Sequence, residues 1–156
     1  MDLYAIFKIA HVIRACVLFG TGLGIAFFMW MANRTADPGI VAGTARIVVI
    51  ADTVFTATAV VAQPATGVAL ATVAGISLLS PWIVLSLALY LLVGACWLPV
   101  VWIQIRLRDL AAEARNAGAP LPAQYHRLFR IWFILGGPAF AGVMAIFVLM
   151  IAKPPL

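Results

Sequence analysis

The sequence is poor in charge. Only 10% of its 156 residues are Asp, Glu, Lys or Arg, and only five residues are acidic. A soluble domain of this length needs a much larger polar surface, whereas 65% of this chain is hydrophobic. The composition therefore excludes a water-soluble globular domain and predicts an integral membrane protein that is surrounded by the lipid bilayer.

Cysteine and histidine are also scarce, with two residues of each. Cys16 and Cys96 lie in apolar runs without a CxxC spacing, so we interpret them as small buried hydrophobic residues. No HExxH, Ser/His/Asp set or Walker sequence is present, so the motifs define no reaction. If the protein is an enzyme, we expect an oxidoreductase.

The net charge of +5 raises the question of nucleic-acid binding. The Arg residues, however, flank hydrophobic runs, and no basic groove with interleaved aromatic residues is present. We therefore expect no nucleic-acid partner and attribute the charge to membrane topology.

Four long apolar runs extend over residues of about 3–31, 44–65, 81–105 and 125–152. Each is long enough for the roughly 20 residues that cross a bilayer as a helix. The helix of the third run is expected to continue to about residue 117, where Gly118 favours a stop. The sequence therefore predicts an all-α fold with a single transmembrane domain over residues 1–156, an integral membrane four-helix bundle.

Basic residues gather around two of the connections between these runs. They are Arg34, Arg46, Arg106, Arg108, Arg115, Arg127 and Arg130, whereas the opposite end offers little beyond Lys8 and Lys153. Because short cytoplasmic loops are rich in Lys and Arg, we expect both termini on the non-cytoplasmic side. The expected location is the bacterial cytoplasmic (inner) membrane.

Three side chains that can carry positive charge occur three residues apart in the first run, "FKIAHVIRACVLFG". Lys8, His11 and Arg14 share one face of a helix at this spacing. An Arg near the middle of a bilayer costs about 2.5–3.5 kcal/mol unless it is paired or hydrated. Asp52 is the only acidic residue expected at a similar depth. We therefore predict either a structural Arg14–Asp52 pair or a polar cavity that contains both side chains.

In the cavity hypothesis, Arg14 and Asp52 form the floor and His11 lies above them. Gln63 and Lys153 flank a mouth that opens to the outer side. Intramembrane ionisable groups are functional candidates by default, so this set is the predicted binding site.

His11 is also the candidate ligand of a haem or metal, because a histidine directed into a membrane bundle commonly has such a role. His126 is expected about 20 Å away along the membrane normal, which excludes a bis-histidine haem within one chain. Met144 is expected at the depth of His11 and is a candidate second ligand, although such a Met more often serves packing. A five-coordinate iron, or two His11 side chains meeting in a homodimer, are the alternatives, and copper is the alternative metal.

Several motifs carry a resemblance to a known family: "KIAHV", "AD" at 51–52, "QPATG" at 63–67, "CWLPVVWIQIRLRDL", "WFILGGPAF" and "LMIAKP". In these, the chain resembles the bacterial predicted integral membrane proteins grouped as domain of unknown function family 2269. The Lys-x-x-His opening and the four-span layout resemble, more distantly, HemJ-type protoporphyrinogen oxidases and CopD-type copper-uptake proteins. The HemJ resemblance implies a haem-binding role for Lys8 and His11, while the later spans depart from that type.

Two functional hypotheses follow. The first is a b-type haem protein of redox or sensor character, with an unidentified redox partner. In it, His11 is the axial ligand, and Lys8, Arg14 or Lys153 offers charge to the propionates. The second is a non-enzymatic membrane protein that handles copper or a small solute, or serves as an accessory subunit, with a structural Arg14–Asp52 pair.

Overall fold

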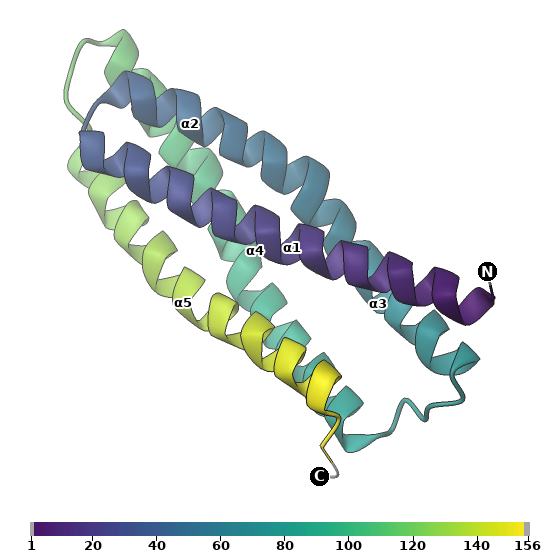
Figure 1. Ribbon diagram of the computed structural model, residues 1–156. Helices are drawn as coiled ribbons and strands as arrows, with labels where there is room; N and C mark the ends of the chain where they lie inside the picture. Colours follow the sequence, from purple (N-terminus) through teal and green to yellow (C-terminus); the bar gives the residue numbers. More distant parts are fainter. Residues whose placement is uncertain (1, 155–156) are drawn as a thin grey trace.

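Four long helical rods build the molecule (Figure 1). The computed structural model describes residues 2–154. The first rod is α1 (Leu3–Thr35), and the second consists of α2 (Pro38–Ala51), a π-helical turn η1 (Asp52–Thr56) and α3 (Ala57–Val73). The third and fourth rods are α4 (Pro81–Asn116) and α5 (Ala123–Ala152). All four are long and apolar enough to span a membrane, which confirms the predicted four-helix membrane bundle.

The two ends of the bundle differ, as Figure 1 shows. The loop end holds the α1–α2 turn at residues 36–37 and the α4–α5 connection at residues 117–122. The terminal end holds both chain termini and the α3–α4 connection at residues 74–80.

The second rod is longer at both ends than the predicted run 44–65. It begins at Pro38, because the Asp37 side chain accepts hydrogen bonds from the backbone N–H groups of Gly39 and Ile40 and a proline suits the first helical position. At the other end Pro64 does not stop the helix, which continues to Val73. The α1–α2 turn is therefore shorter than the sequence indicated.

Pro64 is tolerated because a neighbouring helix replaces the hydrogen bond that proline cannot make. A residue at position 64 of a regular helix would donate to the carbonyl of Val60, and proline has no N–H. The hydroxyl of Tyr90, on α4, donates to this carbonyl instead. Tyr90 thus satisfies a backbone group that the bilayer could not.

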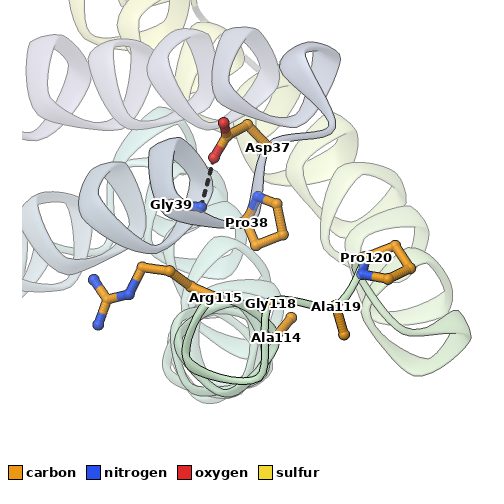
Figure 2. A pocket seen from close by; sticks show the side chains of 8 residues that line it. All are labelled: Asp37, Pro38, Gly39, Ala114, Arg115, Gly118, Ala119 and Pro120. Carbon is orange, nitrogen blue, oxygen red and sulfur yellow. Dashed lines mark hydrogen bonds between the residues drawn. The ribbon is translucent and has the colours of Figure 1, made fainter.

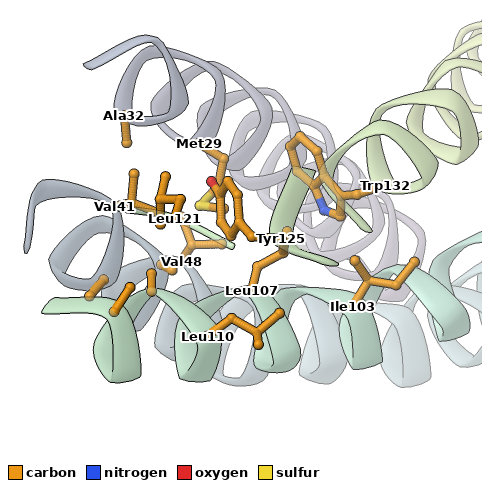
Figure 3. Close-up of a cluster of buried hydrophobic side chains, with 14 of the residues drawn as sticks. Met29, Ala32, Val41, Val48, Ile103, Leu107, Leu110, Leu121, Tyr125 and Trp132 are labelled. Carbon is orange, nitrogen blue, oxygen red and sulfur yellow. The ribbon is translucent and has the colours of Figure 1, made fainter. Parts of the chain in front are cut away.

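The hydrophobic core lies mainly toward the loop end (Figure 3). Its largest fully buried side chains include Met29, Val41, Leu107 and Tyr125, one from each rod. The buried residues of α1 begin only at Ile25. Toward the terminal end, the pair α1 and α3 spreads apart from the pair α4 and α5 in Figure 1.

Two levels of basic residues fit the thickness of a bilayer. Asp52 contacts α4 at Trp97 and Gln104, and Gln104 in turn faces Trp132 on α5. Counting along the antiparallel helices from these contacts places three arginines at one level near the loop end: Arg46, Arg106 and Arg130. At the terminal end, Lys153 lies over the ring of Trp82, and about 34 Å of helix separates it from Arg130.

This separation is close to the roughly 30 Å of a hydrocarbon core, with lysine and tryptophan at one boundary and arginine at the other. Counted along α1 in the same way, Lys8 lies near the level of Lys153. The helices continue by seven to ten residues, or roughly 10–15 Å, beyond the arginine level. Much of the tightly packed core in Figure 3 therefore belongs to this extension rather than to the hydrocarbon region.

Candidate functional site

The candidate site is centred on His11, whose side chain on α1 contacts α3. Its Nδ1 lies 3.1 Å from Oγ1 of Thr66, and its Nε2 lies 3.3 Å from Nε2 of Gln63. The ring rests against Gly67, where a Cβ would stand 3.1 Å from the imidazole Cε1. Glycine therefore permits the close approach of the ring to α3. The contacts join the "KIAHV" and "QPATG" motifs, which are more than 50 residues apart in the sequence.

The hydrogen bonds around His11 set its protonation pattern. The hydroxyl of Thr66 donates to the carbonyl oxygens of Ala62 and Gln63, at 3.0 Å each, and so accepts from the imidazole. Nδ1 then carries the proton, and the lone pair of Nε2 accepts from the Gln63 amide. A neutral imidazole anchored through one N–H, with its second nitrogen as a lone-pair donor, is the form that ligates metals.

The Gln63 amide is held on one side only. Its Oε1 is buried and has no hydrogen-bond partner among residues 2–154, so its single described side-chain link is the one to His11. A metal ion that binds Nε2 would have to replace only this hydrogen bond from Gln63. Gln63 was predicted as a rim residue, and the structure places it directly on the imidazole.

Asp52 takes part in a different set of contacts, with α4 and α5. Its Oδ1 accepts from the indole N–H of Trp97 at 3.3 Å. With the Gln104 amide assigned in the orientation that satisfies both neighbours, Oδ2 of Asp52 accepts from its nitrogen at 3.2 Å and its oxygen accepts from the indole N–H of Trp132 at 3.3 Å. The opposite orientation of the Gln104 amide would place acceptor against acceptor and donor against donor. Asp52, Gln104 and Trp132 are all buried, and we call this set, together with Trp97, the Asp52 chain.

The predicted Arg14–Asp52 pair is therefore wrong. Within residues 2–154 the structure shows a single ion pair, between Arg108 and Asp109 at 2.7 Å. Arg14 instead lies beside Phe55, Thr58 and Ala59. Arg14 meets the second rod at Thr58 and Ala59, so Asp52 lies six to seven residues, or roughly 10 Å, nearer the loop end than Arg14.

The predicted residues consequently lie in separate places rather than around one cavity. His11 and Gln63 meet between α1 and α3, Arg14 lines a groove, and Asp52 faces α4. Lys8 lies over the ring of Tyr4 at 5.5 Å, and Lys153 lies over Trp82 at 5.7 Å. Met144, on α5, is 40% exposed.

Sequence reasoning missed Thr66 and Gly67 as partners of His11. The available signal was their spacing, since both follow Gln63 by three and four residues and so share its helix face. It also missed Gln104, a polar residue in the third apolar run, and the two tryptophans as donors to Asp52.

A groove of about 380 Å³ at the loop end is lined by two charged residues, Asp37 and Arg115 (Figure 2). It lies between the start of α2 and the end of α4. Asp37 there caps α2, and the guanidinium of Arg115 donates to Oδ1 of Asn116 at 3.1 and 3.3 Å. Both charged residues are exposed, so the groove encloses no buried charge.

These features define an integral membrane protein of four spanning helices with polar groups inside its apolar segments. A family model described as predicted integral membrane protein (DUF2269) matches residues 5–154. The match covers nearly the whole chain, so the chain belongs to this family. No curated protein and no solved structure matches it.

Proposed function

We propose that the protein binds b-type haem through Nε2 of His11 and serves a redox or haem-related role. The proposed location is the bacterial inner membrane, with the terminal end on the non-cytoplasmic side. The observation that carries the proposal is the imidazole itself, whose Nδ1–H is anchored by Thr66 and whose Nε2 lone pair is covered only by the Gln63 amide.

The surroundings of His11 suit an apolar ring. The buried core residues of α1 start at Ile25, so the helix face around His11 is not sealed by the packed cluster of the loop end. A macrocycle bound beside His11 would replace lipid contacts with protein contacts, which favours an apolar cofactor.

Charges for the propionates are also present at the terminal end. Lys8 lies one turn from His11 on α1, and Lys153 ends α5. Met144 stays the proposed second ligand, and a five-coordinate iron is the alternative. Bound haem would supply one-electron redox chemistry or gas binding. Thr66 would hold the imidazole in its ligating orientation throughout.

The experiment compares absorption spectra of detergent-purified variants after addition of haem. We expect a Soret band in the wild type and in His126→Ala, the matched control at the exposed second histidine, and no band in His11→Ala. Gln63→Ala frees Nε2 and should bind haem at least as well as the wild type. Thr66→Val removes the anchor and should lower haem affinity by roughly tenfold, as is common for partners of metal ligands.

The variants also separate ligation from folding. Gln63→Ala keeps His11 but removes one of its two side-chain hydrogen bonds. If loss of the contacts between α1 and α3 caused misfolding, the Gln63→Ala protein would also fold poorly. An unchanged Soret band in His11→Ala, at equal protein recovery, would refute the proposal.

A further inference from the structure

Arg14 lies in a groove that opens toward the lipid. The groove, of about 350 Å³, runs between α1 and the second rod, and is lined chiefly by Ile13, Arg14, Val17, Phe55, Thr58 and Ala59. Ile13 is 56% exposed and Phe55 is 52% exposed, so its walls face the hydrocarbon of the bilayer. Apart from Arg14 and the hydroxyl of Thr58, the surface of this groove is apolar.

The guanidinium of Arg14 has no counter-charge within the described chain. No carboxylate of residues 2–154 forms an ion pair with it, and the carboxylate of Asp52 is held by Trp97 on the far side of the second rod. Arg14 is six residues from Lys8, which places it about 9 Å inside the boundary marked by Lys8. An arginine at this depth is unfavourable unless an anion or water reaches it.

The other polar group of the groove cannot act as a second donor. The hydroxyl of Thr58 donates to the backbone carbonyls of Val54 and Phe55, at 2.7 and 3.1 Å. His11, one turn away, directs its ring toward α3. The groove thus offers a planar guanidinium with up to five donors and otherwise an apolar wall.

We propose that this groove binds one anionic phospholipid of the leaflet at the terminal end. The phosphate meets the Arg14 guanidinium, whose fork geometry matches two phosphate oxygens, and an acyl chain lies along Ile13, Val17 and Phe55. Charge complementarity selects the headgroup, and the open apolar walls select a lipid over a water-soluble anion. The many arginines of the loop end differ from Arg14, because most of them lie on the exposed surface.

The site does not depend on haem. The imidazole of His11 packs against Gly67, whereas the groove faces outward between Ile13 and Phe55. The two proposals therefore use different variants and different signals.

The test is native mass spectrometry of the full chain, purified in a neutral detergent, with phosphatidylglycerol or phosphatidylcholine added. We expect one phosphatidylglycerol to bind more tightly than phosphatidylcholine. Arg14→Gln should lose this preference, with an affinity for phosphatidylglycerol lowered about tenfold or more. Arg127→Gln, the control at an exposed loop-end arginine, should change that affinity less than about twofold.

Two further variants keep the proposal falsifiable if Arg14→Gln is not recovered. Arg14→Lys keeps the charge but not the fork, and should lower affinity only several-fold. Thr58→Phe fills the groove without touching the charge and should abolish the preference. Retention of the preference in Arg14→Gln or in Thr58→Phe would overturn the proposal. Loss of added haem from Arg14→Gln, with lipid binding unchanged, would overturn it too and assign Arg14 to a propionate.

Discussion

Asp52→Asn tests the direction of the hydrogen bonds in the Asp52 chain. This series of hydrogen bonds ends on both sides in an indole N–H group, that of Trp97 on one side and that of Trp132 on the other. An indole N–H can only donate. The carboxylate accepts on both sides, and Gln104 passes one bond onward. With an amide at position 52, two amides stand between two obligate donors. Whichever way the amides turn, one donor then faces another donor.

The expected cost follows from this mismatch. One hydrogen bond to a carboxylate, worth about 1.5–3 kcal/mol, is lost, although the average for bonds between membrane helices is nearer 0.6 kcal/mol. Because Asp52 is only 4% exposed, water cannot replace the lost partner. We therefore expect Asp52→Asn to lower the free energy of unfolding by about 1–3 kcal/mol.

The double variant Asp52→Asn/Gln104→Glu restores the pattern. The indole of Trp97 then donates to the oxygen of the new amide at position 52. The nitrogen of that amide donates to the new carboxylate at position 104, which also accepts from the indole of Trp132. The double variant should therefore recover at least half of the loss.

The free energy of unfolding of the wild type and of all these variants is measured in mixed detergent micelles by circular dichroism. Asp109→Asn is the control, because its carboxylate belongs to the partly exposed ion pair with Arg108. A double variant less stable than Asp52→Asn, or an Asp52→Asn protein as stable as the wild type, would refute the reasoning.

Two other substitutions probe the helix contacts by the same unfolding assay. Tyr90→Phe should lower the free energy of unfolding by about 1 kcal/mol, because it leaves the Val60 carbonyl unpaired. In a Pro64→Ala background the same substitution should cost less, because the alanine N–H can donate to that carbonyl. Equal costs of Tyr90→Phe with and without Pro64 would contradict this role. Gly142→Ala should destabilise α4–α5 packing, since the new Cβ would stand 2.6 Å from Cγ2 of Val93. The expected cost of overpacking, about 1–3 kcal/mol, exceeds the gain in helix propensity of about 0.5–1 kcal/mol. Val93→Ala should relieve the clash. A Gly142→Ala protein that is more stable than the wild type would count against the contact.

The sequence predicted the fold well because hydropathy alone reports bilayer-spanning helices. It misplaced the start of the second rod, since that end depends on one capping carboxylate, Asp37, and not on hydrophobicity. The predicted run also ended at residue 65, whereas the helix continues past Pro64 with support from Tyr90 on another rod. Both differences come from contacts that hydropathy does not encode.

The candidate site was predicted only in part for a related reason. The spacing of Lys8 and His11 drew attention to His11, which contacts α3, and its partner Gln63 was in the predicted set. The predicted Arg14–Asp52 pair was wrong because Asp52 faces α4, whereas Arg14 meets the second rod at Thr58 and Ala59, roughly 10 Å nearer the terminal end. Thr66 and Gly67 were overlooked because an uncharged threonine and a glycine acquire their roles only when α3 packs against α1.

The haem content of the purified wild-type protein is the decisive quantity for the proposed role of His11. The protein would be produced in cells supplied with a haem precursor and purified in a mild detergent. Its haem would then be quantified per chain by the pyridine haemochrome spectrum. We expect close to one b-type haem per chain, lost in His11→Ala and retained in His126→Ala. A colourless wild-type protein that also fails to take up added haem would contradict the proposal.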